Sequence, residues 1–231
     1  MNTIEQNVHS IEDQLEKSLR EAQRDRVGLR VVVVTKYVSI EQAKEVVSLG
    51  YKDLGENRPE GLIEKQEALQ DDSIVWHYIG SLQTRKVKKV INRIDYLHSL
   101  DRMSLAKEIE KRAEKPVSCF VQVNVTGEDS KSGFSPDEVM DFIRSLAQFE
   151  KITVIGLMTM APKNADTQTI RKTFSELKQL RDEVQLLGLS YAPCTELSMG
   201  MSQDYPIAIE EGSNFVRIGS AFFKNTTVDE D

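Results

Sequence analysis

The chain has 231 residues, of which 39% are hydrophobic and 29% charged, and its formal net charge is −7. This is the composition of an ordinary water-soluble protein, and the negative charge argues against binding nucleic acid through bulk electrostatics. No stretch reaches the ~18 apolar residues that a membrane-spanning helix needs. Residues 1–6 lack the basic start and apolar core of a secretory signal. We therefore expect a cytoplasmic protein that forms one domain over residues 1–231 and does not bind membranes.

Cysteine and histidine usage gives no sign of a metal site. Cys119 and Cys194 both fall in strand-like runs, so we expect two buried, reduced thiols. The three histidines, His9, His77 and His98, are too scattered to form a cluster with the spacing of metal ligands.

The N-terminal segment has an amphipathic helical pattern. Apolar residues recur at helical spacing at positions 4, 8, 11, 15 and 19, which predicts a helix within residues 1–27 that ends before Gly28. At the other end of the chain, residues 225–231 are polar and acidic, and we expect them to form a frayed tail.

The first predicted strand is the most informative stretch of the chain. Four consecutive valines, Val31 to Val34, predict a strand that is buried on both faces, which is typical of a parallel sheet. Lys36 follows at its C-terminal end. Ser39-Ile40-Glu41-Gln42 then has the form of a capping box and predicts a helix that runs to about residue 50.

The same alternation of strand and helix repeats along the chain. Eight strands alternating with helices in this length favour an α/β fold, a closed (β/α)₈ TIM barrel preceded by the N-terminal helix. An open, doubly wound sheet is the alternative. The seven further strands are predicted at residues 53–55, 74–79, 94–98, 117–125, 152–157, 193–197 and 214–218, and the helices between them begin near residues 59, 81, 101, 136, 167 and 205.

In such a barrel the functional site forms where the strands end. Lys36 would stand there at the end of the first strand, Asn57 after the second and His77 at the third. A lysine in an apolar mouth loses hydration, which lowers the pKa of its ammonium group and makes the amine a candidate nucleophile for an aldehyde. A strand-end lysine that simply reaches into solvent is the alternative interpretation.

Two serine- and glycine-containing segments are predicted at the phosphate-binding position of barrels, after strands seven and eight. A phosphate needs a hydroxyl group, backbone N–H donors and the close backbone approach that glycine permits. The residues that would supply them are Ser198, Gly200, Gly219 and Ser220.

Three further side chains would lie between the lysine and the phosphate segments. Arg217, one residue inside strand eight, would contact a ligand there or else pair with an acidic neighbour. Met158 and Met199 would form the wall against a flat ring or pack in the core. A phosphate at one end, a lysine that traps an aldehyde at the other and an arginine near the ring describe pyridoxal 5′-phosphate.

With these motifs, the chain resembles the pyridoxal phosphate homeostasis protein family, which is similar to the barrel domain of bacterial alanine racemases. The resemblance extends from the N-terminal helix to Phe223. The motifs that carry it are Val34-Thr35-Lys36, Gly55-Glu56-Asn57-Arg58, Trp76-His77-Tyr78-Ile79-Gly80-Ser81-Leu82-Gln83, Val123-Asn124-Val125, Gly156-Leu157-Met158-Thr159-Met160, Leu197-Ser198-Met199-Gly200-Met201-Ser202 and Val216-Arg217-Ile218-Gly219.

The resemblance implies a role for each candidate residue. Lys36 would carry the cofactor as an internal aldimine, Ser198 with the Gly219-Ser220 backbone would hold the phosphate, and Arg217 would face the pyridine nitrogen. Asn57 and His77 would line the pocket.

The resemblance also implies a cytoplasmic, monomeric protein that buffers the cofactor or delivers it to pyridoxal phosphate-dependent apo-enzymes, and that is not itself an enzyme. Racemisation needs a second acid/base on the face of the substrate opposite Lys36, and the chain ends too soon after the eighth strand to carry the domain that supplies it in alanine racemases. The alternatives are a pyridoxal phosphate-dependent amino-acid racemase, a Schiff-base aldolase that uses Lys36 without a cofactor, and an interaction protein with a vestigial site.

Overall fold

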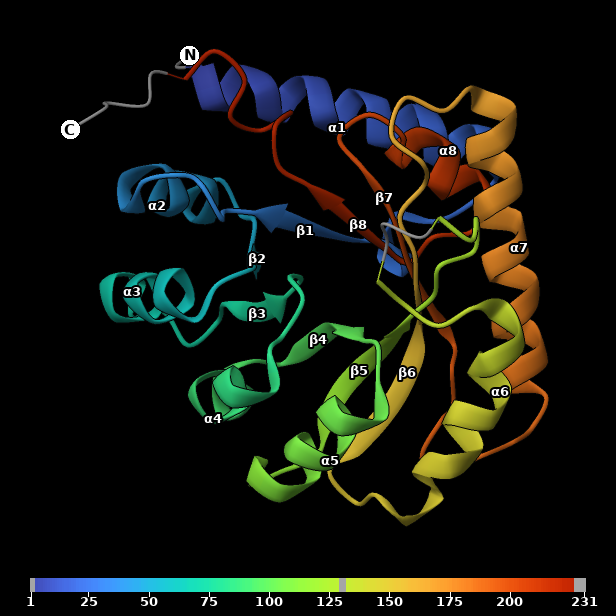
Figure 1. Ribbon diagram of the computed structural model, residues 1–231. Coiled ribbons are helices and arrows are strands. Elements are labelled where there is room, and N and C mark those ends of the chain that lie inside the picture. The colour runs from blue at the N-terminus through green and yellow to red at the C-terminus, as the bar shows by residue number, and fades with distance from the viewer. Residues whose placement is uncertain (1–2, 129–131, 227–231) are drawn as a thin grey trace.

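The computed structural model describes residues 3–128 and 132–226, which form a closed barrel of eight parallel strands (Figure 1). Each strand pairs with the next one along the chain, and β8 pairs with β1. The predicted (β/α)₈ barrel is therefore confirmed, and the open sheet is wrong. The strands are β1 (Arg30–Val34), β2 (Asp53–Glu56), β3 (Val75–Tyr78), β4 (Tyr96–Leu100), β5 (Val117–Gln122), β6 (Ile152–Met158), β7 (Glu196–Met201) and β8 (Phe215–Ile218).

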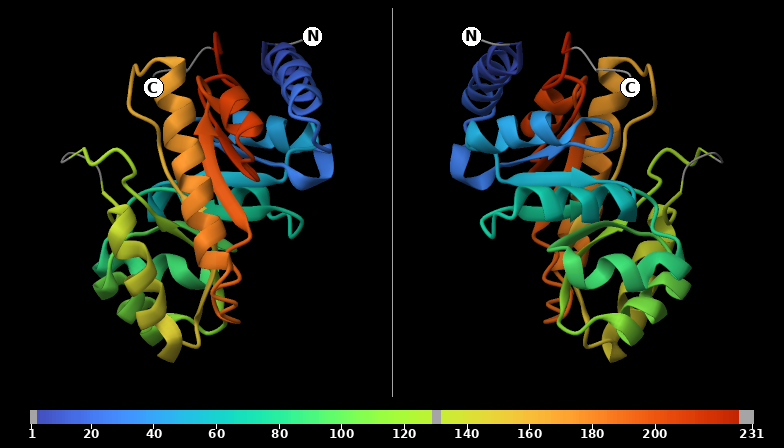
Figure 2. Two further views of the ribbon diagram at one scale, coloured as in Figure 1. Left: turned by 90° about the vertical axis from the view of Figure 1, so that its right-hand side faces the viewer. Right: turned by 90° about the vertical axis from the view of Figure 1, so that its left-hand side faces the viewer.

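Helices surround the barrel, and in the described part of the chain α2 to α8 each connect one strand to the next. The N-terminal helix α1 lies between α8 and α2 and closes the outer ring, as Figures 1 and 2 show. The helices are α1 (Thr3–Glu21), α2 (Ile40–Ser48), α3 (Pro59–Leu69), α4 (Val87–Val90), α5 (Met103–Arg112), α6 (Pro136–Ser145), α7 (Thr167–Gln185) and α8 (Tyr205–Glu210).

The N-terminal helix is shorter than predicted. It ends at Glu21, and the chain then passes through Gln23 in the left-handed region (φ 53°) and the short 3₁₀ turn Arg26–Gly28 before β1. The buried positions on α1 end at Leu19, so a longer helix would have no further apolar face to bury. At the other end of the chain, only residues 225 and 226 of the predicted tail are described; residues 227–231 lie outside the described residues.

The valine strand has the two buried faces that its sequence predicts. Val31 and Val33 pack in the large core between the strands and the helices, whereas Val32 points into the barrel interior beside Phe120 and Phe215. The capping box of α2 is also present, because the Gln42 backbone N–H donates to Ser39 Oγ (3.2 Å) and the Ser39 N–H donates to Gln42 Oε1 (3.0 Å).

The seventh strand lies further along the chain than predicted. Cys194 has φ 46°, which interrupts the extended backbone, and β7 runs from Glu196 to Met201 with an irregular register between Ser198 and Met201. Gly200 has φ 94°, and a Cβ there would lie 2.5 Å from Ala208 Cβ on α8. Ser198, Met199 and Gly200 therefore belong to the strand and not to a loop after it.

Several other expectations concern the whole chain. Cys119 and Cys194 are both free and buried, and burial raises the pKa of each thiol to about 12. Within residues 3–128 and 132–226, no group of three or more His, Cys, Asp or Glu side chains could hold a metal ion. The same residues contain no helix that is both long and apolar enough to cross a bilayer.

Candidate functional site

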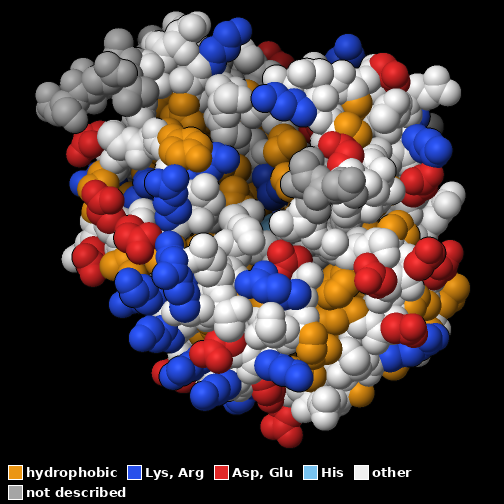
Figure 3. Space-filling model, viewed as in Figure 1, with side chains coloured by type: hydrophobic (Ala, Val, Ile, Leu, Met, Phe, Trp, Pro, Cys, Tyr) orange, Lys and Arg blue, Asp and Glu red, His pale blue; other side chains and the backbone are white. Residues whose placement is uncertain are grey.

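The carboxyl ends of the strands meet on the face of the molecule that is turned toward the viewer in Figures 1 and 3. A hollow lies near the middle of this face, with basic and hydrophobic side chains along its sides (Figure 3). Lys36 follows β1 and is exposed, with its Nζ 5.0 Å from the centroid of the Tyr37 ring. The expected loss of hydration at Lys36 is therefore wrong for this structure, and the amine is accessible to solvent.

A buried polar cluster holds the backbone from which Lys36 projects. Thr35 donates its hydroxyl proton to Glu56 Oε1 (2.6 Å), and its backbone N–H donates to the Gly55 carbonyl (3.0 Å). The same carboxylate oxygen forms an ion pair with Lys65 Nζ at 3.1 Å, and both side chains are buried. Removing one partner of a buried ion pair leaves an uncompensated charge, so this pair ties β1, β2 and α3 together directly behind Lys36.

Asn57 directly follows β2, and its two oxygen atoms differ in their hydrogen bonding. Its backbone carbonyl accepts a hydrogen bond from the Tyr78 hydroxyl (3.0 Å), whereas its side-chain Oδ1 is buried without a partner. Gly80 allows the close packing here, since a Cβ at that position would lie 2.6 Å from the Asn57 carbonyl oxygen. Buried polar atoms are normally hydrogen-bonded, so Oδ1 is an acceptor available to a ligand donor.

The ends of β7 and β8 form a cradle around the Ser202 hydroxyl. The backbone N–H groups of Gly219 and Ala221 both donate to Ser202 Oγ, at 3.2 and 3.3 Å. Gly219 packs tightly against β1, where an added Cβ would lie 3.1 Å from Val34 Cβ, and Ser220 between them is exposed. Backbone N–H groups that converge on one point form an anion-binding concavity.

Ser198 does not lie in this cradle. Its side chain is fully buried inside the barrel, where Oγ is 2.5 Å from Arg217 Nη1 and 2.8 Å from His98 Nδ1. Ser198 was expected to hold the phosphate, but in this structure its hydroxyl lies inside the barrel, whereas the hydroxyl of Ser202, four residues further along, lies in the cradle. The two serines bracket Met199-Gly200-Met201, and only the bulge in β7 decides which of them reaches the mouth.

Arg217 is buried inside β8 and reaches toward the site from the barrel interior. Its second nitrogen, Nη2, donates to the Thr159 carbonyl (3.0 Å), and among the described residues no carboxylate forms an ion pair with it. Burial lowers the pKa of the guanidinium to about 10, and the charge of Asp204 opposes that shift. The alternative of an acidic strand neighbour is therefore not observed, and the guanidinium keeps further N–H groups for an acceptor.

The remaining predicted residues take structural positions. His77 was expected to line the pocket, but both of its ring nitrogens are engaged inside the barrel, by Asp53 and by His98. Met158 packs in the interior cluster with Phe120, and Met199 packs in the outer core. Their side chains therefore fill core space in this structure. Sequence reasoning missed His98 and Ser202, although the alternation of β4 and the serine directly after β7 could have indicated them.

A cavity lies at the opposite pole of the barrel. Its volume is about 390 Å³, and its lining includes Arg30, Tyr96, Glu196 and Phe215, close to the strand starts. None of the residues predicted to bind the cofactor lines it. Chemistry, rather than cavity size, therefore places the candidate site at the strand ends.

Comparison with known proteins agrees with this geometry. The family described as alanine racemase, N-terminal domain, matches residues 7–226. A pyridoxal phosphate homeostasis protein from Aquifex aeolicus is 37% identical over 226 residues, which covers 96% of this chain and 98% of the relative. The chain belongs to the pyridoxal phosphate homeostasis protein family. Another family member, from Pasteurella multocida, is 31% identical over 96% of this chain and 97% of its own length.

Solved structures show the same fold. PipY from Synechococcus elongatus, solved with PLP bound, superposes with a TM-score of 0.83 at 26% identity and covers 96% of this chain and 100% of that one. Alanine racemase from Corynebacterium glutamicum gives a TM-score of 0.69 at 16% identity, over 95% of this chain and 62% of the racemase. At that identity the likeness shows the barrel fold alone.

Proposed function

We propose that this protein binds pyridoxal 5′-phosphate as a Schiff base on Lys36 and acts in intracellular homeostasis of the cofactor, as a buffer or a delivery protein. The proposal rests on three groups at the same mouth of the barrel. They are the accessible amine of Lys36, the cradle around Ser202 and the buried guanidinium of Arg217, which has no carboxylate partner among the described residues. The PLP-bound structure of PipY, a protein of the same fold and similar length, supports it.

The covalent step requires only Lys36 and the aldehyde. Nζ attacks the aldehyde carbon, one water molecule leaves, and a carbon–nitrogen double bond replaces the carbonyl. Because Lys36 is exposed, water and a competing amine have access to the same bond, so attachment stays reversible. Reversible attachment at an open site is what release to a recipient apo-enzyme demands.

The phosphate would occupy the cradle of β7 and β8. The N–H groups of Gly219 and Ala221, which now converge on Ser202 Oγ, would donate to phosphate oxygens, and the hydroxyl groups of Ser202 and the exposed Ser220 would complete the contacts. Hydrogen bonds to an ionised acceptor are roughly twice as strong as neutral ones. Phosphate contacts would thus provide much of the binding free energy.

Arg217 would donate to the ring nitrogen of the cofactor, and Asn57 Oδ1 would accept from a polar group of the cofactor. The cofactor, when bound, supplies a ring that can accept electrons from a reacting amino acid. A cationic donor at the ring nitrogen keeps that nitrogen unprotonated, which weakens this capacity. The arginine therefore favours storage of the cofactor over amino-acid chemistry.

An amino-acid racemase is the second candidate, and the described structure disfavours it. Racemisation needs an acid/base on each face of the substrate carbon. Lys36 can serve one face. For the other face, His77 and Tyr205 are both buried, and both nitrogens of His77 are occupied. Tyr37 is exposed, but it adjoins the lysine on the same segment, with its ring centroid 5.0 Å from Lys36 Nζ.

The test combines labelling with transfer. Protein incubated with PLP should show the absorbance of a Schiff base, and borohydride reduction followed by peptide mapping should place the pyridoxyl group on Lys36. Lys36→Arg keeps the charge but should not be labelled, whereas Lys44→Ala, which removes an exposed lysine on α2, should behave as wild type. The loaded protein should then reactivate a PLP-dependent apo-enzyme. A label on another lysine would refute the site, and failure to reactivate would refute delivery.

A further inference from the structure

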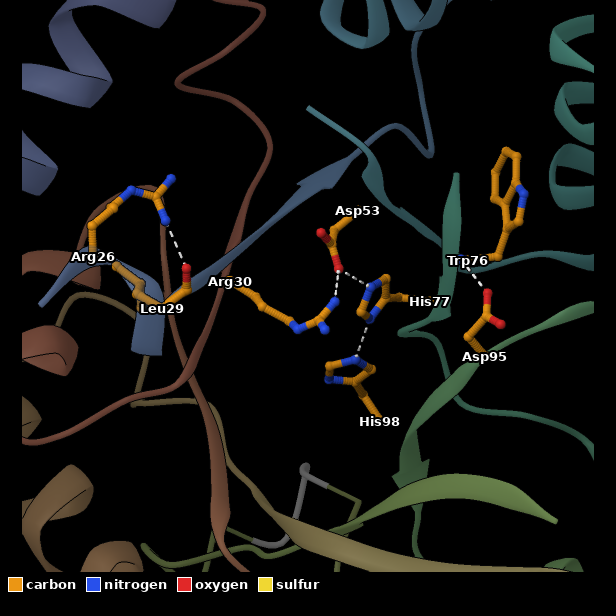
Figure 4. Close-up of polar contacts among 8 residues, drawn as sticks. All are labelled: Arg26, Leu29, Arg30, Asp53, Trp76, His77, Asp95 and His98. Atoms are coloured by element: carbon orange, nitrogen blue, oxygen red, sulfur yellow. Dashed lines mark hydrogen bonds and ion pairs between the residues drawn. The ribbon is translucent and has the colours of Figure 1, made fainter. Parts of the chain in front are cut away.

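A continuous hydrogen-bonded chain runs through the barrel from the candidate site to the opposite pole, and Figure 4 shows its far half. It begins at Arg217, whose Nη1 is 2.5 Å from Ser198 Oγ, and continues from Ser198 to His98 Nδ1 at 2.8 Å. His98 Nε2 lies 2.9 Å from His77 Nδ1, and His77 Nε2 lies 2.9 Å from Asp53 Oδ1.

The direction of each hydrogen bond follows from the Asp53 end. An ionised carboxylate only accepts, so His77 carries its proton on Nε2 and donates it to Asp53. Because burial favours the neutral imidazole, His77 Nδ1 is then an acceptor, and His98 donates to it from Nε2. His98 Nδ1 is in turn an acceptor for the Ser198 hydroxyl proton, and Ser198 Oγ accepts from the Arg217 guanidinium, which can only donate. Both imidazoles are neutral in this arrangement.

The surroundings hold the two histidines in this state. Both are fully buried, and burial lowers the pKa of each imidazole. The ring of His77 stacks on Tyr96 (4.7 Å between centroids, 7° between planes), and the ring of His98 stacks on Phe120 (4.5 Å, 23°). The rings therefore cannot rotate freely to exchange donor and acceptor.

The charged groups that face the hydrogen-bonded chain lie at its two ends. Arg30 Nη1 is 3.0 Å from Asp53 Oδ1, and the carboxylate of Asp95 lies close enough to oppose the lowering of the His77 pKa by burial. The charge of Arg217 disfavours protonation of His98, and the carboxylate of Asp204, at the N-cap of α8, favours the charged form of Arg217. Burial raises the pKa of Asp53, but the hydrogen bonds from His77 and Arg30 and the charge of Arg30 outweigh burial and lower the pKa below its ordinary value, so Asp53 keeps its negative charge.

We propose that Ser198, His98 and His77 are positioning residues that hold the Arg217 guanidinium at the base of the cofactor site through a directed chain anchored on Asp53. The inference rests on the proposed function, because Arg217 is there the partner of the ring nitrogen. A buried arginine without a carboxylate partner needs its donors fixed by neutral acceptors, and the chain makes the Ser198 oxygen a permanent one.

The chain itself can be tested in the cofactor-free protein. Long-range proton–nitrogen NMR spectra should show His77 and His98 as neutral Nε2–H tautomers, with the exposed His9 as the internal reference. A proton on Nδ1 of His98, or a cationic His98 at neutral pH, would overturn the directed chain. This measurement needs neither a variant nor bound PLP, so it stands even if the proposed function fails.

The effect of the hydrogen-bonded chain on the cofactor site is tested with two variants of His98. His98→Asn places an amide oxygen near the position of Nδ1 and keeps an acceptor for Ser198, whereas His98→Leu removes it. We expect His98→Leu to weaken PLP and pyridoxal equally, by about three- to tenfold, and to change the absorbance of the bound cofactor. His98→Asn should have the affinity and the absorbance spectrum of the wild-type protein. Ser198→Ala should behave like His98→Leu.

Ser18→Ala, which removes an equally buried hydroxyl on α1, is the matched control and should change neither measurement. Thermal melting checks that each variant is folded. If PLP labels Lys36 normally and His98→Leu and His98→Asn have the same spectrum and affinity as wild type, the positioning role is refuted while the proposed function stands. If PLP does not label Lys36 at all, the proposed function fails, and the directed hydrogen bonds are then tested by the NMR measurement alone.

Discussion

Two serines four residues apart compete for the role of the phosphate-binding hydroxyl, and the structure predicts opposite outcomes for their removal. Ser202→Ala removes the group on which the Gly219 and Ala221 N–H groups converge, at 3.2 and 3.3 Å. Ser198→Ala removes a hydroxyl that is fully buried and bonded to Arg217 and His98. The two changes are chemically identical, so each serves as the control for the other.

The magnitude follows from the charge on the phosphate. A hydrogen bond to a charged group contributes about 1.5–3 kcal/mol, which corresponds to about 10- to 150-fold in affinity. Ser202→Ala should weaken PLP by this factor and leave pyridoxal, which lacks the phosphate, nearly unchanged. The affinity ratio of the two ligands should fall accordingly. Ser198→Ala acts at the ring end of the site, so it should weaken both ligands alike and leave the ratio at the wild-type value.

The assay is equilibrium titration of each variant with PLP and with pyridoxal, followed by absorbance and confirmed by borohydride trapping on Lys36. Because the affinities for PLP and for pyridoxal are compared within one variant, a general loss of active protein does not change their ratio. The reasoning is refuted if Ser198→Ala lowers the ratio and Ser202→Ala does not. That result would return the phosphate to the residue that the sequence first indicated and would mean that β7 ends earlier than the structure places it.

Three further predictions follow from the described geometry. Wild-type protein should bind PLP at least about 100-fold more tightly than pyridoxal, and equal affinities would contradict a phosphate cradle at Gly219. In a chiral assay with several L-amino acids, turnover should stay far below the ~1–10³ s⁻¹ of ordinary enzymes, and turnover in that range that Lys36→Ala abolishes would promote the racemase alternative. The pKa values of His77 and His98 are lowered in the folded state, so unfolding takes up protons below pH 6.5, and stability should be full above that pH and fall as the pH drops toward the folded pKa values. Below pH 6.5, the free energy of unfolding measured with urea should fall by up to about 1.4 kcal/mol per pH unit for each histidine. His98→Asn should remove the contribution of His98 to this pH dependence; an unchanged pH dependence would show that His98 is protonated in the native state.

The helices and strands and their cyclic order follow from local patterns of residues. Val31 to Val34 could only be a strand buried on both faces, and the capping box at Ser39 placed the start of α2 within one residue, because both signals are local. Eight such alternations in 231 residues left the closed barrel as the favoured topology, and with it the position of Lys36 at the end of the first strand.

Which side chains reach the mouth of the barrel depends on strand pairing and packing. Residues 198–202 have the composition of a loop, but pairing with β6 and β8 extends β7 as far as Met201. Ser198 is thereby buried inside the barrel, and Ser202 follows the end of the strand in the cradle. His77 and His98 are 21 residues apart in the chain and become hydrogen-bonded partners through the pairing of β3 with β4. Strand period and composition are local properties, whereas register and burial depend on neighbours that are distant in sequence, so the polar chain inside the barrel could not be read from the order of residues.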